Sequence, residues 1–598
     1  MKLISTLLWD FLVSSGDEIF SILLEMSGKT GKDIFLLIFQ ILGQKSLESI
    51  EDDTINTQQV QQHLLLEILR LQERTEYGKK YDFASIYSVD SFCSIHPLTS
   101  YEDYRSIIDD IAVTGNYLQL VAEPIILLQQ TAGTTGHSKL IPRTSRLAST
   151  LQKAFFASFE VTRRYYLKNK LLSQCPGLGL FNTAPTSITS GGIPKGLASS
   201  GIKQYKSLQK IANLFFSSPG TVSLIYDSET AYYCHWLFAL SNPEISYLSA
   251  NFASNIIEAF QVLEKNWKNL IDDLYFGTIN RTLVIEPSIR NELESIIKPN
   301  RCCATQLERE FKKGFRGILP RIWSNLSYIQ CITTGSMELY KEKIKFYAGY
   351  VPIYSGNLAA SETWLGLNLE PQRKIPAYTI TPHSAFFEFI PISEHENDNP
   401  NTFKLQALNI GEKYEIVVTT VAGLYRYRTG DIIKCVDYHN QSPTVEFLYR
   451  KGSLLNIAGE KVCETTIFIA INSALSKIYN PSRLTEYTTR INTCKMNYVL
   501  YLELSNESEL TFNINLLAEE IDRAVSRINA VYANFRRSNT IKPLQVSLVK
   551  QDTFVGFKNK VLLTNDSNPQ FKMPRLLKNS VYIDFIENEV IESSLLHK

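Results

Sequence analysis

A strand-like segment, a loop rich in glycine and threonine, and a long helical segment follow one another between residues 118 and 172. The strand-like part, Leu118 to Gln130, ends in a run of Ile, Leu and Gln, and the helical stretch extends from Arg146 to about Leu172. In this order the loop leads to a helix N-terminus, whose free amide groups can bind phosphate. The segment therefore predicts an α/β fold with a candidate anion site in the loop.

The loop reads Thr131-Ala132-Gly133-Thr134-Thr135-Gly136-His137-Ser138-Lys139. Its glycines let the backbone fold closely around an anion, its threonines add hydroxyl donors, and Lys139 supplies a cation. The pattern G-x-x-x-x-G-K-[ST] is absent, so this is not a Walker A loop. An ordinary polar loop is the alternative interpretation of this segment taken alone.

A chain of 598 residues exceeds one ordinary hydrophobic core and predicts about two to four domains. The pattern predicts helices at Gln58–Gln72, Ser254–Leu274 and Leu516–Ala533, and strands at Val222–Tyr226, Ile329–Thr333, Phe386–Pro391, Tyr498–Leu504 and Val546–Lys550. We expect a large N-terminal domain of β-sheets with flanking helices (residues 1–449), a hinge (450–460) and a small mobile α+β domain (461–598).

The composition and net charge of the chain limit the kinds of partner that it can bind. Hydrophobic residues make up 44% and charged residues 20% of the chain, as in ordinary globular proteins. With 61 basic and 60 acidic residues the net charge is +1, so nothing attracts nucleic acid or anionic lipid in general. The apolar stretches Leu3–Leu12 and Ile34–Leu42 are too short to span a bilayer, and their spacing predicts amphipathic helices.

The nine cysteines are scattered without any C-x-x-C pair, which disfavours a zinc site or a disulfide framework. Reduced thiols are typical of a cytoplasmic protein. We expect a cytoplasmic chain that is a monomer or weak dimer, without a nucleic acid partner and without stable membrane insertion.

Two further stretches contain carboxylates in patterns that suit a nucleotide. Residues 358–368 (LAASETWLGLN) place Glu362 after small residues, and a carboxylate at a strand end facing a triphosphate suits Mg²⁺. Residues 423–431 (GLYRYRTGD) place Asp431 after a tight glycine turn, where it can accept two ribose hydroxyl groups. Taken singly, Glu362 also fits a solvated strand end and Asp431 an ordinary β-turn.

In this order, the three stretches resemble the acyl-adenylate-forming superfamily that includes firefly luciferase, and more closely its GH3 branch of acyl acid–amido synthetases. The resemblance covers roughly residues 85 to 585. Its further segments are Phe252–Ser254 before Leu263–Trp267, Ile318–Trp323 before Thr333–Met337, Tyr378–Ile380 with Phe386–Phe389, Arg450–Lys461, and Gln570–Arg575. So many matches in one order make the resemblance specific.

The resemblance implies an enzyme that uses ATP and Mg²⁺ to activate a hydrophobic carboxylic acid as acyl-AMP. It then implies transfer of the acyl group to an amine, that of an amino acid. The residues with implied catalytic roles are Lys572, Glu362 and Lys139, and Glu362 would hold Mg²⁺ through the phosphates. The residues placed at ATP or AMP are Thr131, Ala132, Gly133, Thr134, Ala359, Ala360, Ser361, Asp431, Arg450 and Lys461. The residues placed at the acyl pocket are Gly335, Ser336, Met337, Phe155 and Phe159, with core packing as the alternative for the phenylalanines.

The chain departs from the family pattern at four positions, one of which is Ala132, where a second phosphate-loop hydroxyl is common. Leu358 stands where the family has tyrosine, Ala360 where it has serine, and Ala458 where an acidic hinge residue is usual. A catalytically inactive adenylate-fold binding protein is therefore one alternative, which the retained charged residues oppose. An acyl-CoA ligase is another, since it shares the first half-reaction, but the loop that usually follows the hinge of CoA ligases is missing after Lys451.

Overall fold

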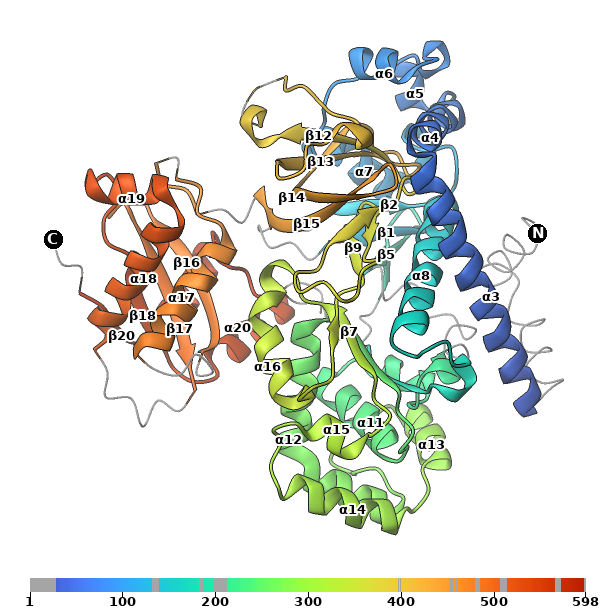
Figure 1. Cartoon of the computed structure of the whole chain (residues 1–598), viewed down its shortest axis with the longest axis vertical. Helices are drawn as coiled ribbons and strands as arrows, with labels where there is room; N and C mark the ends of the chain where they lie inside the picture. Colours follow the sequence, from blue (N-terminus) through green and yellow to red (C-terminus); the bar gives the residue numbers. More distant parts are fainter. Residues whose placement is uncertain are drawn as a thin grey trace. The chain divides into compact units, whose positions relative to one another are not determined.

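The computed structural model divides the chain into two units (Figure 1). It describes residues 28–131, 139–181, 186–197, 212–395, 397, 399–451, 455–458, 460–478, 484–505, 513–564 and 572–595. The first unit comprises residues up to Phe447 apart from two short segments, Thr131–Lys139 and Gly430–Ile432. These segments belong to the second unit, with Leu448–Lys598. The predicted helix at Leu3–Leu12 lies outside the described residues.

Helices make up much of the first unit. They are α3 (Gly28–Ile55), α4 (Thr57–Gln72), α5 (Glu76–Lys80), α6 (Val89–Ile95), α7 (Glu102–Thr114), α8 (Ser145–Tyr165), α11 (Ser228–Leu240), α12 (Ala253–Phe276), α13 (Pro287–Ile296), α14 (Arg301–Phe311), α15 (Ile318–Ile322) and α16 (Glu338–Ala348). Among the described helices, none is at once long and apolar enough to cross a bilayer.

A parallel sheet organises the helices around it. Its strands are β3 (Gly177–Leu180), β6 (Tyr247–Phe252), β7 (Tyr328–Ile332) and β8 (Ile353–Tyr354), in that order. Parallel neighbours need crossover connections, and α12 and α16 lie on two of them (Figure 1). Helix α11 is buried at every residue from Thr230 to Leu240, because it lies between the sheet and α12.

A second, larger sheet carries two of the predicted motifs. Its strands are β9 (Asn357–Ala359), β10 (Trp364–Leu367), β11 (Tyr378–Ile380), β12 (Phe386–Pro391), β13 (Lys413–Thr419), β14 (Tyr427–His439) and β15 (Ser442–Arg450), in the order β12-β13-β14-β15-β11-β10-β9. Alternating apolar residues of these strands form a core with α4 and α7. Glu362 follows the edge strand β9, and Asp431 lies on the interior strand β14.

A short hairpin contains the phosphate-loop candidate and corrects one expectation. Strands β1 (Leu127–Gln130) and β2 (Leu140–Arg143) pair antiparallel and, with β4 (Ser187–Ile188) and β5 (Pro194–Gly196), form the sheet β2-β1-β5-β4. The loop therefore joins two strands, so our prediction that it leads directly into a helix is wrong. Leu128 and Ile141 are both buried, so apolar burial as well as backbone pairing favours a strand at residues 140–143.

The second unit has its own sheet and core. Its strands are β16 (Leu484–Asn492), β17 (Asn497–Leu504), β18 (Gln545–Val549), β19 (Leu576–Leu577) and β20 (Val590–Ser593), in the order β19-β16-β17-β18-β20. Its helices are α17 (Glu464–Ile478), α18 (Ile514–Ile528), α19 (Ala530–Arg537), α20 (Thr553–Thr564) and α21 (Ser580–Glu587). Parallel and antiparallel pairs both occur in this sheet.

The predicted α/β fold class is confirmed, whereas several predicted elements are wrong in detail. The strand predicted over Leu118–Gln130 covers only Leu127–Gln130, and the helix predicted to extend to about Leu172 ends at Tyr165. The predicted strand Val222–Tyr226 is a 3₁₀ helix over Gly220–Leu224. The predicted helix Leu516–Ala533 is two helices, because Asn529 caps α19 by accepting the Tyr532 N–H at 2.9 Å. The proposed domain limits and the hinge at 450–460 remain predictions.

Candidate active site

The base of the phosphate-loop candidate is closed by two hydrogen bonds. The Thr131 N–H donates to the Lys139 carbonyl at 2.9 Å, and the Lys139 N–H donates to Thr131 Oγ1 at 3.0 Å. Thr131 therefore fixes the loop ends as well as offering a hydroxyl. The residues Ala132, Gly133 and Thr134 lie outside the described part of the chain.

Glu362 lies in the turn between β9 and β10. The Ala360 N–H donates to the Thr363 carbonyl at 2.9 Å, and Thr363 Oγ1 donates to the Ser384 carbonyl at 2.9 Å. These bonds hold Glu362 inward with only 1% of its surface exposed. Within the described residues, its Oε2 atom has no hydrogen-bond partner. A buried carboxylate oxygen without a partner is costly, so this position suits a bound cation.

The donor set around Glu362 fits Mg²⁺ better than a metal held by protein alone. No group of three or more His, Cys, Asp or Glu side chains able to hold a metal occurs in the part of the chain that the structure describes. Mg²⁺ is usually bound by one or two carboxylates together with substrate phosphates. Glu362 is therefore a suitable protein ligand for Mg²⁺ brought in with ATP.

The residues before Glu362 differ in exposure along the edge strand. Ala359 is exposed, Ala360 and Ser361 are half-buried, and Leu358 packs in the core at 7% exposure. Leu358 thus contributes to stability, and the placement of Ala359, Ala360 and Ser361 at the nucleotide remains a prediction.

The segment Gly335–Met337 follows the carboxyl end of β7 as a single 3₁₀ turn. Gly335 has a φ of 61°, and a Cβ there would meet Phe447 Cε1 at 3.0 Å, so the turn requires glycine. Ligands of parallel α/β sheets bind outside the carboxyl ends of the strands. Gly335 and Ser336 are half-buried there, while Met337 is buried at 2%. Their part in an acyl pocket remains a prediction.

The phenylalanines of α8 have packing partners on α3. The ring centroids of Phe155 and Phe159 lie 6.3 and 5.4 Å from that of Phe39, edge to face. This contact accounts for both side chains without a ligand, so their placement in the acyl pocket stays a prediction.

Ser158 of α8 is a further candidate site residue, and it was not identified from the sequence. It is 2% exposed, its hydroxyl has no partner among the described residues, and a Cβ at Gly356 would lie 3.3 Å from its Oγ. Gly356 follows β8 at the carboxyl edge of the parallel sheet. A serine in a helix carries no sequence signal for such a position.

In the second unit, the structure brings together Asp431, Arg450 and Lys572. Arg450 Nε lies 3.4 Å from Asp431 Oδ1, with the aspartate side chain 10% exposed. Burial, followed by the positive charge of Arg450, lowers the pKa of Lys572 to about 8, while Asp431 and Glu464 act in the opposite direction. These three residues, far apart in sequence, thus form one charged cluster.

A tight turn around Glu460 contains the last predicted nucleotide residue, Lys461. The buried Glu460 carboxylate accepts the N–H groups of Ile457 and Ala458 at 2.7 and 2.8 Å, and also the Tyr498 hydroxyl. Lys461 follows with a φ of 47°, a left-handed conformation that is unusual for lysine. Glu460 thus fixes the turn from which Lys461 projects.

Tyr498→Phe is expected to lower the free energy of unfolding of the second unit by about 1.5–3 kcal/mol, because a hydrogen bond to a buried carboxylate is lost. Urea melts read by circular dichroism measure this, with Tyr350→Phe (80% exposed in the wild type) as the matched control. A loss below ~0.5 kcal/mol, typical of surface substitutions, would contradict the role given to Glu460.

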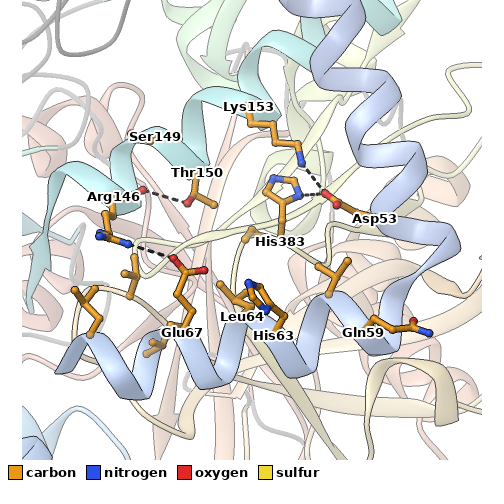
Figure 2. A pocket seen from close by; sticks show the side chains of 15 residues that line it. Asp53, Gln59, His63, Leu64, Glu67, Arg146, Ser149, Thr150, Lys153 and His383 are labelled. Carbon is orange, nitrogen blue, oxygen red and sulfur yellow. Dashed lines mark hydrogen bonds and ion pairs between the residues drawn. The ribbon is translucent and has the colours of Figure 1, made fainter. Parts of the chain in front are cut away.

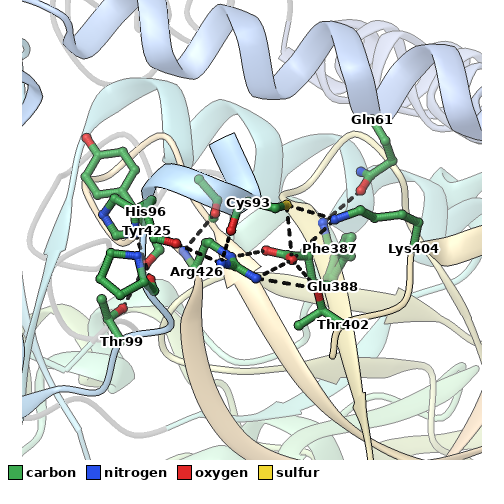
Figure 3. A network of polar contacts seen from close by, with 12 residues as sticks. Gln61, Cys93, His96, Thr99, Phe387, Glu388, Thr402, Lys404, Tyr425 and Arg426 are labelled. Carbon is green, nitrogen blue, oxygen red and sulfur yellow. Dashed lines mark hydrogen bonds and ion pairs between the residues drawn. The ribbon is translucent and has the colours of Figure 1, made fainter. Parts of the chain in front are cut away.

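Arg426, the first arginine of the GLYRYRTGD stretch, stabilises the fold through a buried network of hydrogen bonds (Figure 3). Arg426 Nε and Nη2 each donate to Glu388 at 3.0 Å, and Nη1 donates to the carbonyls of Cys93 and His96 at 2.7 Å. Arg426 and Glu388 are 6% and 1% exposed. This buried network fixes the start of β14, the strand that carries Asp431.

The first unit also contains a cavity of about 680 Å³ (Figure 2). It is lined by α4, α8 and the turn with His383, where Lys153 and His383 both contact Asp53 Oδ2, at 2.6 and 2.9 Å. None of the residues predicted to bind ATP or acid lines it.

Comparison with known protein families identifies three consecutive domains. The GH3 family N-terminal domain matches residues 46–353, the central domain residues 378–450, and the C-terminal domain residues 466–581. The matched segments occur in the family's own order along the chain.

Curated relatives and solved structures agree with this assignment. The indole-3-acetic acid-amido synthetase GH3.17 of Arabidopsis thaliana is 31% identical, over 92% of this chain and 95% of the relative. The jasmonoyl-L-amino acid synthetase JAR6 of Nicotiana attenuata is 29% identical, over 92% of this chain and 96% of the relative. The structure of the GH3.15 acyl acid amido synthetase has 26% identity and a TM-score of 0.81, covering 92% of this chain and 97% of that chain. The chain therefore belongs to the GH3 family.

Proposed function

We propose that this chain is an ATP-dependent acyl acid–amido synthetase, which joins a hydrophobic carboxylic acid to the amine of an amino acid. The observation that carries the proposal is the match of all three GH3 domains, in order, between residues 46 and 581. The relatives named above are amido synthetases, and a GH3.15 structure of similar fold was solved in complex with 2,4-DB.

In the first half-reaction the substrate carboxylate attacks the α-phosphorus of ATP, and pyrophosphate leaves. Negative charge grows at phosphorus, and positioned donors and cations stabilise it. We assign Thr131, Gly133, Thr134 and Lys139 to the phosphates, with Ala132 in the same loop. Glu362 would hold Mg²⁺, which neutralises phosphate charge when bound.

The remaining contacts place the nucleotide. Asp431 would accept the ribose hydroxyl groups, and Arg450, held by Asp431, would lie at the ribose or phosphate. Lys461 would contact the nucleotide from the turn after the hinge. The residues Ala359, Ala360 and Ser361 would line the adenine side, and Lys572 would meet the α-phosphate.

In the second half-reaction an amine attacks the acyl carbonyl and AMP leaves. AMP is a far better leaving group than the hydroxide-like oxygen of a free carboxylate, so activation makes amide formation possible at neutral pH. Gly335, Ser336, Met337, Phe155 and Phe159 are assigned to the acyl pocket. The requirement for ATP is consistent with a cytoplasmic location, and the proposal includes a monomer or weak dimer.

A matrix of carboxylic acids against amino acids, with Mg²⁺-ATP, tests the function by the mass of the conjugate. We expect AMP and pyrophosphate with an amide product, and indifference to added coenzyme A. Acid-dependent release of ADP would refute adenylation. Acyl-CoA formed as fast as any amide would instead identify an acyl-CoA ligase.

The pKa of about 8 at Lys572 predicts the pH dependence of adenylation. The ammonium form carries the charge that stabilises phosphate, so kcat/KM for ATP is expected to fall as pH rises through about 8. Lys572→Arg keeps its charge throughout this range, and its falling limb should move to higher pH. The test is to measure pyrophosphate exchange from pH 6 to 10 in both proteins. If the fall in kcat/KM occurs at the same pH in Lys572→Arg as in the wild type, the group that titrates is not Lys572.

A further inference from the structure

The segment that carries Lys572 is anchored by a buried arginine three residues later. Arg575 is 3% exposed, and its guanidinium lies 4.4 Å above the centre of the Tyr487 ring. Its Nη1 donates to Glu486 Oε1 and to the Tyr487 carbonyl, both at 2.5 Å. The Thr489 N–H also donates to the Arg575 carbonyl at 3.0 Å. The backbone after Lys572 is therefore fixed against β16.

Glu464 contacts the same arginine from another element. It is the first residue of α17, and its Oε1 lies 3.3 Å from Arg575 Nε. A carboxylate in the first turn also suits the helix dipole. Glu464 is 15% exposed, so little water screens its charge.

The charge of Glu464 also acts on Lys572. The charged groups that act on that lysine are Arg450 from β15, Asp431 from β14 and Glu464 from α17. Glu464 in turn pairs with Arg575, which also binds Glu486. Burial raises the pKa of Glu464 above its ordinary value, while Arg575 and Lys572 oppose this rise and Glu486 adds to it. If the charge of Glu464 were removed, Asp431 would be the one remaining carboxylate among these groups that favours the ammonium form of Lys572.

We propose that Glu464 is a positioning residue for adenylation, holding Arg575 and Lys572 together so that the lysine is presented as an ammonium from a fixed segment. The inference rests on the proposed function in assigning adenylation to Lys572. The ion pair between Glu464 and Arg575, and the action of the Glu464 charge on Lys572, are independent of that function and can be measured without catalysis.

The experiment measures how fast an amine-reactive anhydride labels Lys572 at each pH, read by peptide mass spectrometry of the full chain. In the wild type the labelling midpoint should lie near pH 8. Glu464→Gln, which keeps the shape and loses the charge, should move it about one pH unit lower. Glu464→Asp should restore most of the shift.

Glu486→Gln is the matched control, because Glu486 contacts Arg575 but is not among the groups that act on Lys572. It should leave the midpoint in place. An unmoved midpoint in Glu464→Gln, or an equal shift in Glu486→Gln, would overturn the inference. The proposed function fails by a separate result, the absence of acid-dependent pyrophosphate exchange in the wild type, whatever the labelling shows.

Discussion

Glu362→Gln is expected to lower acid-dependent ATP–pyrophosphate exchange by about 10³-fold, while the protein melts at the same temperature or higher. Activity falls because the amide is a poor ligand for Mg²⁺. Stability does not fall, because the carboxylate oxygen Oε2 has no partner among the described residues and its burial is costly in the free protein. Exchange assays and thermal melts on the same preparations measure both quantities.

Glu388→Gln is the matched control, since Glu388 is also 1% exposed but both of its oxygens bind Arg426. Breaking this buried ion pair should reduce the free energy of unfolding by about 3–5 kcal/mol. At temperatures where the variant is folded, its exchange activity should stay near that of the wild type. Wild-type exchange in Glu362→Gln would instead make Glu362 an ordinary buried residue.

Lys572→Ala is expected to lower kcat for pyrophosphate exchange by roughly 10²–10³, with little change in KM for ATP. This pattern arises when a charge-assisted contact forms mainly in the transition state. Lys572 is half-buried beside Asp431 and Arg450, unlike a solvated surface lysine. Steady-state exchange with varied ATP measures both constants.

Synthetic acyl-adenylate separates the two half-reactions. Supplied with it and an amine, Lys572→Ala should form amide at nearly the wild-type rate. Lys578→Ala, at an exposed lysine further along the same segment, should change neither half-reaction. If Lys572→Ala slowed both half-reactions equally, the lysine would act on domain closure in general.

Long periodic segments could be predicted from the sequence, and short ones could not. The predicted helix Ser254–Leu274 is α12 (Ala253–Phe276), because a 3.6-residue apolar period over that length leaves little ambiguity. Strand β2 was missed, since four residues hold no period and only the pairing with β1 defines them. Val222–Tyr226 has β-branched residues, yet tertiary packing places its first part in a 3₁₀ helix.

Some features of the candidate site could also be predicted from the sequence, and others could not. Motif order along the chain was enough to name Asp431, Arg450 and Lys572, and the structure shows them as one cluster. The unsatisfied oxygen of Glu362 and the buried hydroxyl of Ser158 are properties of three-dimensional packing. No local pattern of residue types encodes whether a polar atom lacks a partner, so the sequence could not predict either.

The two hydrogen bonds between Thr131 and Lys139 fix the residues on either side of positions 132–138. Since β1 and β2 hold the two ends at a fixed separation, the entropy of closing the loop changes only slowly with its length. Laboratory grafting can therefore change the residues that we propose to contact the triphosphate while the flanking strands keep their pairing. The same hairpin is a natural starting point for recruiting other nucleotides or phosphate analogues as substrates.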